Sequence, residues 1–444
     1  MKTRASQSRG SYPDPNTPPM RKAHVPGPAS HALIRLWAWG ALVAALPNDA
    51  RASKGFNLIE NDAEAAAMHG GAAALVSNPA AARINPANLA LLREPAAQST
   101  TAYYYTYGDF TDLAGNTIRS EKPNKFAGSF FASVPITGTA TFGFGVENSY
   151  GSSVFWPKEG PFKYFTAHEG QLKYFDFTPS IGVRVSDSFR FGATLNVAYA
   201  QLSLSQLYPW AALTRNPATP DGEMEFECDD VGLGGTIGMS WDVTPRHHLA
   251  FVARTPIHFR FEGDYEITKI PFPIQGVTRR SDLQAQLDIP AELTLSYAWD
   301  LTQKLTLGAE FSYIFNSAVE DFRIDVGGNN VLFPSTTTRL GWHDSIAASL
   351  GGKYRLTPQL SLLAGYQYTE SPMEEKTYTP LIPGIDRHLV SAGVAYERGP
   401  VALKLAFSKG FFPDLEIRSN TVSAFNGTHS LELNVVTMSC AIKF

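Results

Sequence analysis

The sequence lacks the features that mark most other classes of protein. Its 444 residues include two cysteines, Cys228 and Cys440, whose wide separation supports neither a disulfide framework nor a metal or redox motif. After residue 52 there is no run of 18 apolar residues, so no membrane-spanning helix is predicted. There is also no Gly-x-Ser-x-Gly elbow, and we expect neither an enzyme nor a bound cofactor.

The N-terminal residues have the pattern of a targeting signal. Basic residues precede an apolar run over residues 36–46, and an Ala-x-Ala cleavage site follows at 50–52. We therefore predict a signal peptide over residues 1–52. The Pro-rich stretch before Met20 fits no signal region, which makes Met20 a second candidate for the start of translation.

Basic residues are scarce in the mature chain. Removal of the seven basic and two acidic residues of 1–52 leaves 30 basic against 39 acidic residues, a net charge of −9. A nucleic-acid partner is not expected, because such partners require a basic face.

Alternation of apolar and polar residues dominates the rest of the sequence. In the last strand, one face carries the residues that alternate back from the C-terminus: Phe444, Ile442, Cys440, Met438 and Val436. A terminal strand that ends in Phe is typical of outer-membrane barrels. A soluble β-sandwich also alternates, so alternation by itself leaves both folds open.

The connections favour the barrel. The pattern predicts fourteen strands, over residues 98–107, 124–135, 139–150, 171–185, 189–204, 230–243, 246–266, 283–298, 303–324, 337–357, 359–370, 385–398, 401–416 and 430–444. Even-to-odd joints are tight and odd-to-even joints are long, as in bacterial barrels with short periplasmic turns. We predict an all-β fold: a fourteen-stranded antiparallel transmembrane β-barrel over 95–444, in the outer membrane of a Gram-negative cell.

The segment 53–94 is rich in Ala and Gly and shows no period-two stretch. It either hangs into the periplasm or folds back as an N-terminal plug inside the lumen. It contains Asn85, Pro86 and Ala87, an order of residues that favours a compact turn.

These residues resemble a motif of a known family. The run from Asn85 to Leu92 is similar to the Asn-Pro-Ala plug motif of the FadL/TodX (OmpP1) family of outer-membrane transporters for hydrophobic compounds. Further similarity in order and spacing lies at Phe261 to Tyr265, Trp342 to Asp344 and Asp386 to Arg387. Residues 313–316 lack the Trp that many members carry in the ninth strand, so details of the pocket do not transfer.

The resemblance implies a barrel blocked by an N-terminal hatch. In the family, outer loops gather a hydrophobic ligand, an inner pocket holds it, and a kink in the third strand releases it sideways into the membrane without energy input. Long-chain fatty acids and aromatic hydrocarbons both suit an apolar cavity, and the sequence does not choose between them.

Two long outer connections are unusually apolar, which supports a capture site. They contain Leu207, Tyr208, Trp210, Leu213, Ile270, Phe272 and Ile274. The alternative is that these side chains only pack together and stiffen the mouth of the barrel.

The third strand is the expected place of lateral exit. Its apolar alternation lapses after Val146, at Asn148, Ser149, Tyr150 and Gly151. Bulges and glycines permit a local interruption of the hydrogen-bonded ladder. The family resemblance places the inward kink in this same strand.

Several charged residues have competing interpretations. The acidic run Glu223 to Asp230 is predicted as a loop, which either holds Ca²⁺ or is bridged to surface lipid by diffuse cations. Arg184, Arg190 and Lys404 could pair with a ligand carboxylate, or could be ordinary charges of a polar lumen.

The function predicted from these features is passive uptake of hydrophobic small molecules by a monomer embedded in outer-membrane lipid and lipopolysaccharide. The alternative is a structural or adhesive barrel whose outer loops bind host or phage proteins. A transporter requires an apolar pocket beneath the outer loops, and an adhesin does not.

Overall fold

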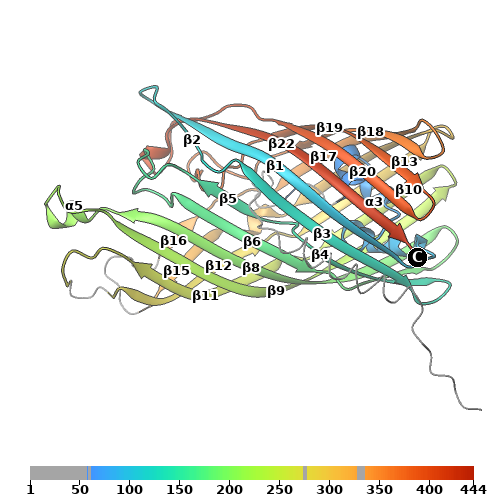
Figure 1. Ribbon diagram of the computed structural model, residues 1–444, viewed down its shortest axis with the longest axis horizontal. Helices are drawn as coiled ribbons and strands as arrows, with labels where there is room; N and C mark the ends of the chain where they lie inside the picture. Colours follow the sequence, from blue (N-terminus) through green and yellow to red (C-terminus); the bar gives the residue numbers. More distant parts are fainter. Residues whose placement is uncertain (1–57, 59–61, 274–277, 328–335) are drawn as a thin grey trace, which may run out of the picture.

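The chain forms one antiparallel sheet that closes on itself. The computed structural model describes residue 58 and residues 62–273, 278–327 and 336–444. Strand β1 (Ala96–Asp112) pairs with β3 (Asn124–Pro135) on one side and with β22 (Gly427–Lys443) on the other, which closes the barrel (Figure 1). The predicted signal peptide lies outside the described residues.

Fourteen strands make up the wall, as predicted. Seven are unbroken: β1, β3, β22, β8 (Phe189–Tyr208), β9 (Gly222–Thr244), β18 (Leu360–Thr369) and β19 (Arg387–Arg398). Seven consist of two pieces: β4 (Ala140–Glu147) with β5 (Ser152–Phe155), β6 (Glu169–Phe177) with β7 (Ser180–Arg184), β10 (His247–Arg254) with β11 (Ile257–Ile267), β12 (Arg280–Ile289) with β13 (Glu292–Asp300), β14 (Leu305–Ile314) with β15 (Asp321–Val326), β16 (Thr336–Arg339) with β17 (Ser345–Arg355), and β20 (Val401–Phe411) with β21 (Leu415–Ile417). The short β2 (Thr117–Arg119) extends β1 as an outer hairpin.

Proline explains four of the breaks that alternation alone did not predict. Pro179, Pro256 and Pro290 stand between the two pieces of the fourth, seventh and eighth wall strands, and Pro413 stands in the same position in the thirteenth. Proline has no N–H to donate to a neighbouring strand, so it interrupts the ladder.

Short turns and long connections lie at opposite ends of the barrel. Six tight turns share one end with the C-terminus, and the long connections share the other (Figure 1). By the usual orientation of bacterial barrels, the short turns face the periplasm. The helix α5 (Trp210–Thr214) lies at the far outer tip.

The polarity of both faces of the wall inverts midway along the barrel. Near the turns, β8 turns Leu195 to the lipid side and the buried Thr194 to the lumen. Farther out, Leu202 faces the lumen, whereas Gln201 and Ser203 face outward. Strands β9, β11 and β12 have the same apolar inner face in the outer half. The periplasmic half therefore has a polar lumen, and the outer half has an apolar core.

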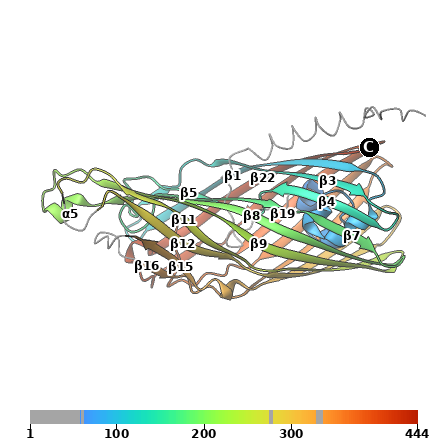
Figure 2. The same cartoon turned by 90° about the horizontal axis from the view of Figure 1, so that it is seen from below.

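The segment before β1 fills the periplasmic half of the lumen. It contains α2 (Ala63–Met68), α3 (Ala72–Leu75), α4 (Ala81–Ile84) and the 3-10 helix η1 (Pro86–Leu91), drawn in blue inside the barrel in Figure 2. We call residues 62–92 the plug. Two further 3-10 turns lie farther along the chain: η2 (Asn316–Ala318) in the break between β14 and β15, and η3 (Ser423–Phe425) in the connection between β21 and β22. None of the helices in the described part of the chain is long and apolar enough to cross a membrane.

Two rows of lumen-facing glycines seat the plug. Gly182, Gly192 and Gly238 are paired across β7, β8 and β9, and an added Cβ on any of them would collide with Asn85 or Pro86. Gly308, Gly351 and Gly365 form a similar row across β14, β17 and β18, beneath the backbone of Met68 and Gly70. Plug and wall therefore touch backbone to backbone, which side chains at these positions would prevent.

Candidate functional site: an apolar chamber, a charged floor and a break in the wall

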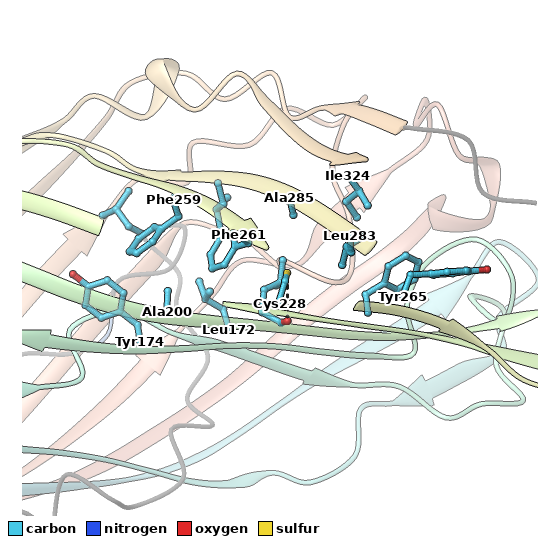
Figure 3. Close-up of a cluster of buried hydrophobic side chains, with 14 of the residues drawn as sticks. Leu172, Tyr174, Ala200, Cys228, Phe259, Phe261, Tyr265, Leu283, Ala285 and Ile324 are labelled. Atoms are coloured by element: carbon cyan, nitrogen blue, oxygen red, sulfur yellow. Dashed lines mark hydrogen bonds between the residues drawn. The ribbon is translucent and has the colours of Figure 1, made fainter. Parts of the chain in front are cut away.

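A large apolar cluster fills the lumen of the outer half. Figure 3 shows Phe259 and Phe261 of β11 pointing across the lumen toward Tyr174 and Leu172 of β6. Phe261 and Tyr174 are completely buried, although they stand on strands whose inner face is polar closer to the turns. The polarity inversion of the wall thus creates an apolar interior above the plug.

A chamber of about 380 Å³ lies within this apolar region. That volume is within the range of pockets that hold small organic ligands, roughly 300–1,000 Å³. Its apolar lining comes from both wall and outer connections: Leu172, Leu202, Leu204, Phe226, Leu287, Phe322, Ile324, Leu340, Leu381 and Ile382. Such a chamber can bind a molecule by burying apolar surface.

Three outer connections, over residues 165–167, 377–382 and 420–425, form the roof of the chamber. Hydrogen bonds join two pairs of neighbouring connections. The Trp156 indole Nε1 donates to the Pro380 carbonyl at 3.2 Å, and the Asn420 amide donates to the Tyr378 carbonyl at 2.9 Å. The roof is therefore a bonded assembly of loops from distant parts of the chain.

The chamber has one charged group among the described residues that line it, the exposed guanidinium of Arg339 on β16. No carboxylate of the described residues forms a salt bridge with it. A ligand with an anionic end could place that end here and its apolar part inward.

Charged side chains form a floor beneath the apolar cluster. They line a small cavity of about 80 Å³ between plug and wall. Arg83 of α4 pairs with Glu147 of β4 at 2.9 Å, and Arg254 pairs with Glu292 at 3.4 Å. Moving an apolar ligand through this layer would separate buried ion pairs, which is costly.

The plug is fixed to the wall by ion pairs. Lys404 and Lys353 contact the Glu64 carboxylate at 2.6 and 2.7 Å. Burial by itself would raise the pKa of Glu64, but the two lysine charges lower that pKa to about 2. Lys404 is thus an anchor of the plug.

Arg190 pairs with Asp242 at 2.5 Å, and Arg184 donates to the Gly138 carbonyl at 3.0 Å.

The third wall strand is interrupted where the sequence suggested an exit. Strand β4 ends at Glu147 and β5 begins at Ser152, so Asn148, Ser149, Tyr150 and Gly151 lie in the break. The Asn148 side chain bridges the neighbouring strands: its amide donates to the Tyr174 carbonyl at 2.8 Å, and its oxygen accepts from the Gly128 N–H at 3.2 Å.

The plug and Leu58, which precedes it in the chain, close the inner side of this break. The Leu58 N–H donates to the Ser149 carbonyl at 2.9 Å, and the Arg83 Nε donates to the Ser149 hydroxyl at 3.3 Å. Arg83 also pairs with Glu147, the last residue of β4. Hydrogen bonds from side chains and contacts with the plug therefore hold the break together, in place of a strand ladder.

The motif Asn85, Pro86 and Ala87 lies in the plug, on the first glycine row. The Asn85 side chain donates to the Ala73 carbonyl at 2.7 Å and to the Ser240 hydroxyl at 2.8 Å, and its oxygen accepts from the Ala87 N–H at 3.1 Å. All three residues are buried. The motif thus fixes the plug against β9, whereas Arg83 and Leu58 reach the break.

The outer-loop residues selected from the sequence are not in the chamber lining. Trp210 is fully buried, its ring packs at a tilt against that of Tyr208 with centroids 4.6 Å apart, and its indole N–H donates to the Thr268 carbonyl at 3.2 Å. Leu207 is buried, and Ile270 packs at the edge of the apolar cluster. Leu213 and Phe272 are 51% and 52% exposed. Ile274 lies outside the described residues.

The chamber residues were missed, although the sequence carried a signal for them. Along 189–204, even positions change from Arg190, Thr194 and Asn196 to Leu202 and Leu204. A lumen-facing series that turns from polar to apolar indicates an apolar interior near the outer end. The assumption of a uniformly polar lumen hid this change.

The acidic run Glu223 to Asp230 belongs to strand β9 and is not a loop. Period two separates its members: Glu225, Glu227 and Asp229 face outward, whereas Met224 and Phe226 face inward. A fully extended backbone spreads carboxylates along a line instead of wrapping them around an ion. The described residues contain no group of side chains that could hold a metal ion.

Comparison with known proteins gives consistent results. A family model described as "Outer membrane protein transport protein (OMPP1/FadL/TodX)" matches residues 43–444. A "47 kDa outer membrane protein" of Pasteurella multocida is 23% identical over 354 residues, which cover 75% of this chain and 81% of that protein. The "Long-chain fatty acid transport protein" of Escherichia coli is 21% identical, over 80% of this chain and 86% of that one.

Solved structures share the fold. The crystal structure of a Pseudomonas aeruginosa FadL homologue superposes with a TM-score of 0.76 at 21% identity, covering 88% of this chain and all of that one. The Pseudomonas putida toluene transporter TodX superposes with a TM-score of 0.66 at 16% identity, covering 88% and 99% of the two chains.

Proposed function

The chain belongs to the outer-membrane protein transport family (OMPP1/FadL/TodX), and from that premise we propose that it is a passive channel for hydrophobic compounds. The single observation that carries the proposal is the 380 Å³ apolar chamber inside the outer half of the barrel. A structural or adhesive barrel has no need of an apolar interior space beneath its loops.

Exposed apolar side chains at the outer tip provide the first contact with the ligand. Leu213 and Phe272 stand at the end farthest from the plug and are about half exposed. Trp210 and Tyr208 support this surface from below. The ligand then passes under the roof and buries its apolar surface in the chamber.

Release is sideways, through the break at Asn148 to Gly151. The charged floor and the seated plug oppose axial movement of an apolar molecule. At the break, bonds from Asn148 and bonds from Leu58 and Arg83 to Ser149 take the place of a continuous ladder, and release requires these local bonds to part. Two family relatives are named for fatty acids and for toluene, which are both apolar cargoes.

The first test fills the chamber. Leu204→Trp would place an indole in the chamber, whereas Leu195→Trp, on the same strand, points to lipid. We expect the first variant to lower uptake of a fluorescent fatty acid by about tenfold and the second to leave uptake within about twofold. Normal uptake by Leu204→Trp at normal surface expression would refute the chamber as the route.

The second test concerns capture at the tip. Leu213→Asp with Phe272→Asp should lower uptake at low ligand concentration, because charge repels an apolar ligand from this surface. Both side chains are exposed, so assembly should be unaffected. Trp210 is unsuitable for this purpose because its indole is buried and bonded. Unchanged uptake would mean that the tip residues only stiffen the mouth.

Arg339 favours an amphiphile with an anionic end over a plain hydrocarbon. Arg339→Gln should weaken binding of a fatty acid by about tenfold and leave binding of the corresponding alcohol unchanged. Equal effects on both ligands would assign Arg339 no part in selection. Mass spectrometry of ligand co-purified with the barrel would identify the natural cargo.

Crosslinking tests the exit. A disulfide between cysteines introduced at Asn148 and at Gly128 of β3, which are joined by hydrogen bonds, should hold the break shut. Uptake should fall and recover on reduction, with the barrel folded in both states. Undiminished uptake by the oxidised barrel would exclude release through this break.

A further inference from the structure

A cationic cavity lies at the periplasmic mouth, apart from the chamber and the break. Its volume is about 250 Å³, and residues at the periplasmic ends of three hairpins line it. The turn after β9 contributes Arg246, the turn after β13 contributes Lys304, and the end of β17 contributes Lys353 and Arg355. Residues more than one hundred positions apart thus bring four cations to one cavity.

The backbone holds these positions together. The Asp300 N–H donates to the Arg246 carbonyl at 2.9 Å, and the Arg355 N–H donates to the Lys304 carbonyl at 2.7 Å. Both bonds continue the ladders of the wall. The convergence of charge is therefore a property of the folded barrel rather than of mobile side chains alone.

Three of the four cations have no partner among the described residues. No carboxylate of that part of the chain forms a salt bridge with Arg246, Lys304 or Arg355, and all three are exposed. Lys353 is engaged with Glu64 at 2.7 Å. The only acid in the lining, Asp300, is occupied by the Thr306 hydroxyl at 2.6 Å and by His248 Nε2 at 3.3 Å.

Four cations against the single carboxylate of Asp300 leave an excess of positive charge in this lining, and a bound anion would relieve their mutual repulsion. Two guanidinium groups and an ammonium group are the donors that proteins use for phosphate, because a guanidinium can bond two oxygens at once. Thr302 and Gln303 add neutral polar groups to the lining. Basic pockets at the edge of a membrane also bind lipid headgroups by the same chemistry.

We propose that this cavity binds a phosphate group from the periplasmic side. The group belongs either to the headgroup of an inner-leaflet phospholipid or to a free phosphate. Because Lys353 lines the cavity and also holds Glu64 of the plug, the bound phosphate shares a cation with the plug anchor. Lys404 keeps Glu64 in place when Lys353 turns toward the phosphate.

The test uses the purified full-length barrel and does not depend on hydrophobic uptake. Inorganic phosphate is titrated by calorimetry into the barrel in an uncharged detergent. Arg355→Gln should weaken phosphate binding by about fivefold. The double variant with Arg246→Gln should weaken it by about a further fivefold. Lys304→Gln serves in place of Arg355→Gln if that variant assembles poorly.

The matched control is Arg398→Gln, which removes an exposed cation from the end of β19, at another periplasmic turn and outside the cavity. It should leave phosphate binding within about twofold, because exposed charges at a distance are screened. Equal losses in the control and in Arg355→Gln would mean that only net charge matters, and would overturn the site.

A lipid arm distinguishes the two sources. Barrel from nanodiscs with phosphatidylglycerol is analysed by native mass spectrometry. A lipid that is retained by the wild type, lost from Arg246→Gln with Arg355→Gln and not displaced by phosphate supports the headgroup. Saturable phosphate binding without lipid retention supports the free anion. If the barrel neither retains the lipid nor binds phosphate saturably, the proposal is overturned.

Discussion

The two halves of this barrel are built from the same strands but place their apolar side chains on opposite faces of the wall. The periplasmic half faces lipid, so its outer side is apolar and its lumen is polar and filled by the plug. The outer half faces water, so its outer side is polar and its lumen holds the apolar cluster and chamber. The apolar side chains thus lie on the outer surface in the periplasmic half and on the lumen side in the outer half. In each half they occupy the side of the wall that is shielded from water.

The difference explains where a hydrophobic cargo can reside. In the periplasmic half, small residues press the plug against the wall and ion pairs fix it. In the outer half, apolar side chains leave space between them. The charged floor separates the halves, and the break at Asn148 lies at the same level, beside Arg83 and Glu147.

The largest expected contrast is in stability. Phe261→Ala in the outer core removes a fully buried ring and should lower the free energy of unfolding by about 3–5 kcal/mol. Leu295→Ala on the lipid side should cost below about 1 kcal/mol, because lipid is as apolar as the side chain it replaces. Urea unfolding of both variants in one detergent measures the difference. Similar losses in both would break the distinction between a packed outer core and a lipid-solvated wall.

A second contrast concerns the seat of the plug. Gly238→Leu would collide with the Asn85 side chain, whereas the Cβ of Gly235→Leu would make only an ordinary contact with the Thr194 carbonyl, at 3.8 Å. The first variant should displace the plug and raise ion conductance in planar bilayers by about tenfold or abolish assembly. The second should conduct like the wild type. A closed, well-assembled Gly238→Leu barrel would show that the glycine row does not position the plug.

The smallest expected effect is a pH dependence of plug anchoring. The Glu64 pKa of about 2 lies below its usual value of 4.5, so its ion pairs stabilise the plug fully above pH 4.5. This stabilisation is lost as the pH falls from about 4.5 through about 2. Conductance should rise over that window in the wild type, and Glu64→Gln should remove this component. A pH response that persists unchanged in Glu64→Gln would assign it to other groups.

The sequence by itself determined the fold. Period-two alternation, tight turns and long outer connections predicted the fourteen-stranded barrel, because these are local properties of each strand. The interruption of the third strand near Asn148 was also visible locally, where apolar alternation lapsed. The exchange of polarity along residues 189–204 was equally present in the sequence.

Only the tertiary structure decided which residues meet. The chamber joins the roof connections with β6, β8 and β9, and the cationic cavity joins two turns with the end of β17. No local pattern predicts such convergence, because barrel closure and strand stagger set it. The same holds for Trp210, which looks exposed in a loop sequence yet is buried against Thr268, just after β11, and Gly222 of β9. Periodicity tells which side of the wall a residue faces, and packing alone tells what it touches.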